Sequence, residues 1–128
     1  MKKIILSLTI LLFIFSCKKV KLPDSQSQAL IGKWKYVNSS GGMIGIQENA
    51  NRPEIEFTKY GKYKFKDKKL FTFNKKFEIT IVNSIYTRLD VNAIKYSDNF
   101  IQSFLIRNDT LFLRDEAYDA FVYTYVRK

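Results

Sequence analysis

Apolar and polar residues alternate with a period of two along most of the chain after residue 30. In "EIEFTK" the apolar positions are Ile55 and Phe57, and in "KFEITIV" they are Phe77, Ile79 and Ile81. Successive side chains of a β-strand point to opposite faces of the sheet, so this pattern predicts half-buried strands with one wet face.

Short β-rich runs of this kind are separated by turn signals, and no run has the period of an amphipathic helix of normal length. The predicted strands are "GKWKYVN", "EIEFTKY", "KYKFK", "LFTF", "KFEITIV", "NAIKYS", "FIQSFLIR", "TLFLR" and "AFVYTYVR". Turns are expected at Gly61, at "DKK" from Asp67, at "NKK" from Asn74, at "SDN" from Ser97 and at "RND" from Arg107. Closely spaced strands with tight turns favour an all-β antiparallel meander, and closing it into a barrel of about eight strands removes the exposed edges.

The first residues have the pattern of an export signal. Lys2 and Lys3 precede a mainly apolar run from Ile4 to Phe15, which lysines close on the other side. The run is shorter than the roughly 20 apolar residues that a membrane-spanning helix needs. We therefore expect residues 1–16 to be a cleaved signal peptide.

The only cysteine of the chain, Cys17, follows this run directly and has no partner for a disulfide. With Ser16 before it, the stretch resembles the lipobox of bacterial lipoproteins, although Ile14 and Phe15 stand where the commonest lipobox has Leu and a small residue. The resemblance implies that Cys17 becomes the first residue of the mature chain and carries a diacylglyceryl thioether and an acyl group such as palmitate. It also implies a lipid anchor in a membrane of the cell envelope, and we expect this to be the outer membrane.

Two alternatives remain open at this point: an uncleaved membrane anchor, or an ordinary signal cleaved elsewhere that leaves a free thiol at Cys17. Residues 17–30 are polar and contain a proline, which predicts a tether that could end in one helical turn at 24–30. Residues 31–128 then form the barrel domain.

The first predicted strand opens with Gly32, Lys33 and Trp34, and Arg127 ends the last strand on the same face as three aromatic residues. This arrangement resembles the lipocalin-like β-barrels, in which Gly-x-Trp opens the first strand and a basic residue of the last strand packs on the tryptophan. The segments "LIGKWKYVNSSGGMIGI", "PEIEFTKYGKY", "DTLFLRD" and "YTYVRK" are similar, in this order, to small lipocalin-like lipoproteins of bacteria. The resemblance implies that Gly32, Trp34 and Arg127 together close the barrel.

A hydrophobic ligand inside the barrel is the function that this family suggests. The candidate lining residues are Tyr36, Phe57, Phe65, Phe77, Phe104 and Tyr123. The alternative is a structural or protein-interaction lipoprotein with a filled barrel, because small barrels can be packed solid or hold one ligand. The glycine-rich segment "SSGGMIGIQENANRP" carries Met43, Ile44 and Ile46, which could cover the barrel mouth as a lid or plug it.

Enzymatic chemistry is not expected. The chain has no histidine and no second cysteine, and it lacks the G-x-S-x-G and phosphate-loop patterns. Asp115, Glu116 and Asp119 could hold an oxygen-liganded ion such as calcium, but they lack the spacing of a calcium loop, and a solvated acidic turn explains them. We predict no catalytic residues, no metal and no cofactor.

Basic residues outnumber acidic ones, 22 to 12, which gives a formal net charge of +10. Much of this charge lies on neighbouring strands, at Lys59, Lys62, Lys64, Lys66, Lys68, Lys69, Lys75 and Lys76. Such a face could contact an anionic lipid or glycan of the envelope, or it could only keep the sheet soluble and block edge pairing. Export makes nucleic acid an unsuitable partner.

Overall fold

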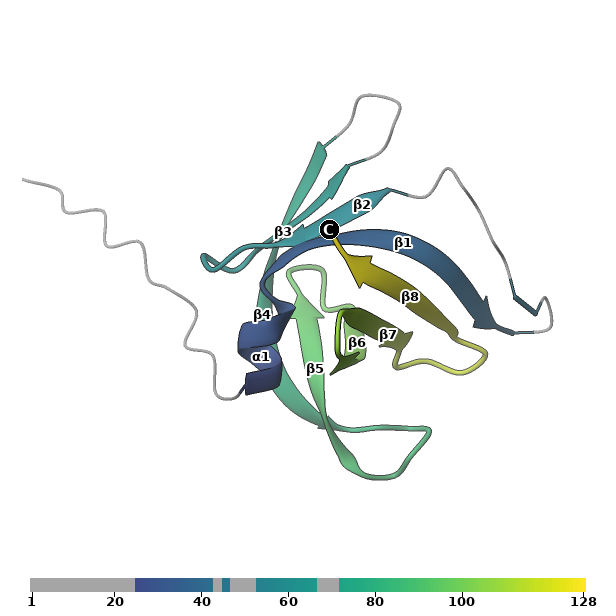
Figure 1. Ribbon diagram of the computed structural model, residues 1–128. Coiled ribbons are helices and arrows are strands. Elements are labelled where there is room, and N and C mark those ends of the chain that lie inside the picture. The colour runs from purple at the N-terminus through teal and green to yellow at the C-terminus, as the bar shows by residue number, and fades with distance from the viewer. Residues whose placement is uncertain (1–24, 43–44, 47–52, 67–71) are drawn as a thin grey trace, which may run out of the picture.

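The computed structural model describes residues 25–42, 45–46, 53–66 and 72–128 (Figure 1). The predicted signal peptide, Cys17 and most of the predicted tether lie outside these residues, as do Met43 and Ile44 of the predicted lid. Within the described ranges, no helix is long and apolar enough to cross a membrane.

The described part of the chain forms one short helix followed by eight strands. They are α1 (Ser25–Leu30), β1 (Gly32–Gly41), β2 (Glu54–Phe57), β3 (Lys62–Lys66), β4 (Thr72–Asn83), β5 (Asp90–Tyr96), β6 (Ile101–Arg107), β7 (Thr110–Asp115) and β8 (Phe121–Arg127). Each strand pairs antiparallel with the next one, and β8 pairs with β1. The predicted all-β class and closed eight-stranded meander are confirmed, and the barrel is compatible with a lipocalin-like fold.

The turn predicted at Asn74 is wrong, because Asn74 lies inside the single strand β4, which runs without a break from Thr72 to Asn83. Asn74 pairs with Lys64 of β3, and Lys76 still lies opposite Lys62. From Phe77 onward the same strand pairs with β5 instead. The polar residues are tolerated because Asn74 and Lys76 are exposed, so they need no turn to reach solvent.

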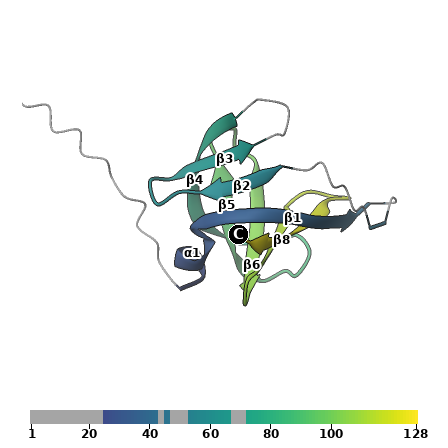
Figure 2. The same ribbon diagram turned by 45° about the horizontal axis from the view of Figure 1, so that its top comes forward.

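Inward-facing side chains fill the barrel with apolar and aromatic groups. The buried core cluster consists of Leu30, Trp34, Tyr36, Ile55, Phe57, Phe77, Ile94, Tyr96, Phe104, Ile106, Leu111, Leu113 and Tyr125. Several rings meet in edge contacts that aromatic pairs favour, with centroids 5.7 Å apart for Tyr36 and Tyr125 and 5.2 Å apart for Phe57 and Phe77. Helix α1 covers one end of this core, as Figure 2 shows, and its Leu30 is fully buried.

The β1–β8 and β5–β6 pairings differ in the number of residue pairs that they contain. Strands β1 and β8 share seven residue pairs, from Trp34 opposite Arg127 to Gly41 opposite Phe121. Strands β5 and β6 share only three, from Ala93 opposite Ser103 to Lys95 opposite Ile101.

Beyond Ala93, strand β5 leaves β6 and the β4–β5 hairpin continues past the barrel (Figure 1). We call residues 81–92 the arm. Ile81 has the same inward direction as Phe77 but is 64% exposed, because this part of β4 already lies beyond the core. The tip of the arm is fixed to the turn after β7, where the Glu116 carboxylate accepts hydrogen bonds from Ser84 Oγ at 3.1 Å and from the Ile85 N–H at 3.0 Å.

Candidate functional site

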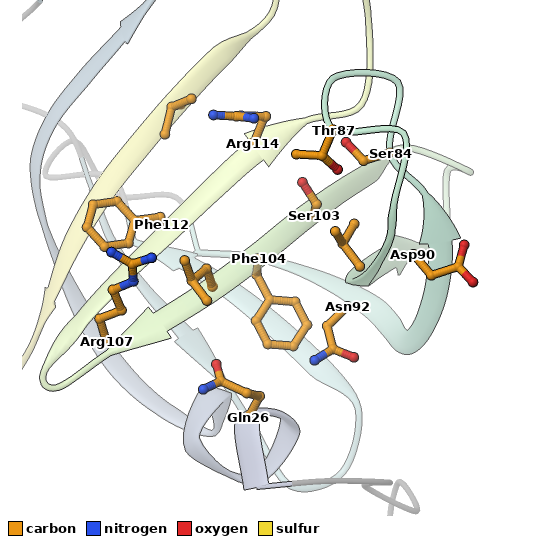
Figure 3. A pocket seen from close by; sticks show the side chains of 13 residues that line it. Gln26, Ser84, Thr87, Asp90, Asn92, Ser103, Phe104, Arg107, Phe112 and Arg114 are labelled. Carbon is orange, nitrogen blue, oxygen red and sulfur yellow. The ribbon is translucent and has the colours of Figure 1, made fainter.

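A cleft of about 600 Å³ opens where the arm departs from β6 (Figure 3). We call it the outer cleft, because one of its sides is the outer face of β6, β7 and β8. Strand geometry explains this placement: Phe104 and Ile106 point into the core, so Leu105 and Arg107 must point outward.

The apolar part of the outer cleft comes from neighbouring strands in register. Leu105 of β6 lies opposite Phe112 of β7, and Arg114 lies opposite Ser103 on one side and Val122 on the other. Leu105 and Phe112 therefore form an apolar surface on the outside of the barrel, and Val122 extends it as the diagonal neighbour of Phe112. Leu105 is 43% exposed, so this surface is open to solvent.

The arm supplies the opposite side of the cleft, with Ser84, Thr87, Asp90, Val91 and Asn92. It is held in place by Tyr86, whose hydroxyl donates to the Ala117 carbonyl and whose ring lies 4.9 Å from the Arg114 guanidinium carbon. This cation–π contact also fixes the Arg114 side chain at the edge of the cleft.

Gln26 of α1 reaches the base of the cleft and takes the place of a missing strand partner. Its Nε2 donates to the Ile106 carbonyl at 3.2 Å, and the Ile106 N–H donates to its Oε1 at 3.0 Å. One side-chain amide thus satisfies the donor and the acceptor that β6 presents where β5 has left it. No sequence pattern indicates this role, because Gln26 lies in a segment with the composition of a tether.

The six predicted lining residues all lie in or against the barrel core. Phe104 borders the outer cleft, and Phe77 borders a second cleft of about 370 Å³ beside Tyr96. Tyr36 and Phe57 contact other rings inside the barrel, while Phe65 and Tyr123 pack against the core from its margin. Ile46 of the predicted lid is 74% exposed.

Trp34 and Arg127 lie opposite each other at the start of the β1–β8 pairing. The guanidinium carbon of Arg127 is 4.2 Å from the centroid of the fully buried Trp34 ring. Arg127 Nη1 donates to the Ile31 carbonyl at 3.3 Å and Nη2 to the Ala29 carbonyl at 2.6 Å. The indole N–H donates to the Leu30 carbonyl at 2.9 Å, so the pair also satisfies carbonyls at the C-terminal end of α1.

Gly32 leaves the space that this arrangement needs. A Cβ at this position would lie 2.8 Å from Arg127 Nη1. The backbone φ of +140° is also one that residues with a side chain rarely adopt. The structure thus brings together the three residues predicted to close the barrel.

A buried polar chain links β5, β6, β7 and β8 at the closed part of the β5–β6 pairing. The Tyr96 hydroxyl donates to Gln102 Oε1 at 2.7 Å, and Gln102 Nε2 donates to Asp115 Oδ1 at 2.7 Å. Tyr123 donates to the other carboxylate oxygen of Asp115 at 3.4 Å. Burial raises the pKa of Tyr96 well above its ordinary value, and burial likewise raises the pKa of Tyr63.

Two of the three carboxylates predicted as possible ion ligands have other roles in the structure. Asp115 belongs to the buried polar chain, and Glu116 holds the tip of the arm. Among the residues that the structure describes, no group of three or more His, Cys, Asp or Glu side chains could hold a metal ion.

The predicted basic face is partly neutralised by ion pairs. Lys64 lies 3.8 Å from Glu56, Lys75 pairs with Asp98, and Lys95 outside the predicted set lies 3.7 Å from Glu78. Lys62 and Lys66 are exposed on the outer face of β3 and Lys76 is exposed on β4, while Lys59 lies over the Tyr60 ring at 5.2 Å. Lys68 and Lys69 fall outside the described residues.

Neither the models of known protein families nor the curated proteins give a significant match to this chain. The barrel and its outer cleft are therefore the basis of the functional proposal.

Proposed function

We propose that the protein is a lipid-anchored lipoprotein of the bacterial cell envelope that binds a small hydrophobic molecule and catalyses no reaction. The observation that carries this proposal is the outer cleft, with its apolar surface of Leu105, Phe112 and Val122. Its volume of about 600 Å³ lies in the range of small-molecule sites. Since the barrel core is occupied by the protein's own rings, we place the ligand in the outer cleft and not in the barrel.

Burial of exposed apolar surface supplies the driving force for such binding. Leu105 is 43% exposed although it lies in a concave site, and a ligand that covers it removes apolar area from water. The polar groups around the apolar surface, including Ser84, Thr87 and Asn92, would fix the orientation of the ligand.

An anchor at Cys17 would keep this cleft close to a membrane. Helix α1 begins at Ser25, eight residues after Cys17 (25 − 17), and eight residues span at most about 30 Å of extended chain. Gln26, which borders the cleft, would therefore stay within roughly that distance of the anchored residue. The exposed lysines of β3 and β4 could add contacts with anionic lipid or glycan at the same surface.

The anchor is tested by metabolic labelling with a radioactive fatty acid, which should mark the wild type and not Cys17→Ser. Label retained in the variant would contradict the lipid anchor.

The binding site is tested by photo-crosslinking of the full chain in phosphatidylcholine vesicles to a long-chain alcohol that carries a diazirine. Adducts should map to the arm and to the outer face of β6–β8, and Leu105→Gln should reduce them. Val126→Gln is the matched control, because Val126 is a 36% exposed residue on the outer face of β8 that does not line the cleft. Adducts on inward residues such as Phe57 would move the site into the barrel.

A second candidate function is that of a protein-interaction lipoprotein with a filled barrel. The packing of Tyr36 against Tyr125 and of Phe57 against Phe77 supports it, because these rings occupy space that a ligand inside the barrel would need. Absence of any adduct with the neutral probe would favour this function over ligand binding.

A further inference from the structure

Two arginines border the apolar surface of the outer cleft at opposite ends. Arg107 follows Leu105 by two residues on β6, and Arg114 follows Phe112 by two residues on β7, while Leu105 and Phe112 lie opposite each other. All four side chains are on the outer face, because residues two apart on a strand share a face. Arg114 lies opposite Ser103, which is four residues before Arg107 on β6. The two arginines are therefore separated by about 13 Å along the strands.

Carboxylates near these arginines are engaged elsewhere. Glu116 accepts hydrogen bonds from the arm tip, Asp109 lies 3.7 Å from Arg127, and Asp90 accepts a hydrogen bond from Asn83 Nδ2 at 3.2 Å. Within the described part of the chain, Arg107 takes part in no ion pair.

The two arginines differ in whether the guanidinium is free to bind a ligand. Arg114 is held over the Tyr86 ring, whereas Arg107 is exposed and lies next to the base of the cleft that Gln26 closes. Figure 3 shows both side chains with Phe112 at the same cleft. Arg107 is therefore the cation that is free to meet a charged ligand.

We infer that the outer cleft selects a single-chain amphiphile with an anionic head group, which Arg107 binds while the alkyl chain lies over Leu105 and Phe112 toward Arg114. This inference rests on the proposed function and names its ligand class. A guanidinium offers a planar fork of donors that matches a carboxylate or a phosphate, so both head groups share the required chemistry. The volume of about 600 Å³ is that of a small-molecule site, which suits one chain.

The test compares three diazirine probes of equal chain length: a fatty carboxylate, an alkyl phosphate and a fatty alcohol. Each is crosslinked at pH 8 to the full chain in phosphatidylcholine vesicles, and labelling of the cleft is divided by the amount of probe in the vesicles. A charge-assisted hydrogen bond predicts that one or both anionic probes label the cleft about tenfold more than the alcohol. A preference for only one anion would identify the head group.

Variants separate a specific contact from general surface charge. Arg107→Gln should reduce labelling by the anionic probes about tenfold and leave labelling by the alcohol unchanged. Lys35→Gln is the control, since Lys35 is exposed on the outer face of β1 opposite Val126 and removes the same charge away from the cleft.

The outcomes that overturn the inference are distinct from those that overturn the proposed function. Equal labelling by all three probes, or equal losses in Arg107→Gln and Lys35→Gln, would refute anion selection while ligand binding in the cleft stands. No labelling of the cleft by any probe would refute both.

Discussion

The β1–β8 and β5–β6 pairings both lie in the same barrel, yet one is fully closed and the other is half open. Seven residue pairs join β1 to β8, and three join β5 to β6. The two pairings also differ in connectivity: β1 and β8 come from distant parts of the domain, whereas a short turn at residues 97–100 joins β5 to β6 covalently. When two strands are far apart in the sequence, their contacts must offset the entropy cost of closing the long loop between them. A hairpin has a smaller cost, so few residue pairs are enough to hold it.

Each pairing has a residue that completes it, and the two residues do so differently. Arg127 stacks on Trp34 and binds carbonyls of Ala29 and Ile31, so it adds to a long ladder. Gln26 binds Ile106 from outside the sheet and replaces a ladder that is missing. The closed side thus gives stability, and the open side gives the space for a site.

The largest effect is expected at the closed side. Trp34→Ala should lower the free energy of unfolding by roughly 3 to 5 kcal/mol, because it removes a fully buried ring. Arg127→Lys should destabilise less, since it loses the planar stacking and the two-carbonyl contact. The double variant should fall short of the sum by about 0.5 to 2 kcal/mol, the range of a cation–π contact. Urea denaturation measures all three, and strictly additive losses would contradict the pairing.

Alkaline pH should destabilise the barrel through two buried phenols whose rings are in contact, Tyr96 of β5 and Tyr63 of β3. The pKa values of Tyr96 and Tyr63 are raised by burial, so the folded state keeps both phenols protonated while the unfolded chain ionises them above about pH 10. Their contribution is therefore complete below that pH and is lost as the pH rises, by up to about 1.4 kcal/mol per tyrosine and pH unit.

Urea denaturation between pH 9 and pH 11 measures this slope. Tyr96→Phe should make it shallower, although the variant starts from a lower stability because it loses the bond to Gln102. Tyr118→Phe should leave the slope unchanged, since Tyr118 is 89% exposed. An equal slope in wild type and Tyr96→Phe would assign the alkaline sensitivity to other groups.

The smallest effect is expected at the open side. Gln26→Ala should cost about 1 to 2 kcal/mol, because the N–H and C=O of Ile106 both lose their partner. Gln28→Ala removes the same side chain from an exposed position of the same helix and should be nearly neutral. Hydrogen exchange should show faster exchange of the Ile106 amide in Gln26→Ala than in the control; equal rates would show that α1 does not complete β6.

Local patterns predicted the barrel well, because they depend on the alternation of side chains along each strand. Ile55 and Phe57 point inward as the pattern requires. The contact between Trp34 and Arg127 was expected from strand parity together with the resemblance to lipocalin-like barrels. The prediction of a turn at Asn74 was wrong, because β4 continues through this residue and changes its partner from β3 to β5 at Phe77. The composition of three polar residues does not distinguish such a change of partner from a turn.

The outer cleft could not be predicted, since it depends on where β5 stops pairing with β6 and on how the arm returns to Glu116. Both are long-range properties that no short window contains. The outward direction of Leu105 and Arg107 was present in the alternation of β6, but without the register of β7 it did not identify a surface.

The amide bridge from Gln26 to Ile106 also decides how the domain carries mechanical load. A pull on the chain ahead of Ser25 acts on α1, which continues covalently into β1. Besides the backbone, α1 passes the force by a first path to β6 through Gln26 and by a second path to the end of β8 through Arg127. The first path has two hydrogen bonds to one residue, and the second has two hydrogen bonds and the stacked indole behind them. Tension at the N-terminal side would therefore reach the edge of the outer cleft while the β1–β8 ladder still holds the barrel shut.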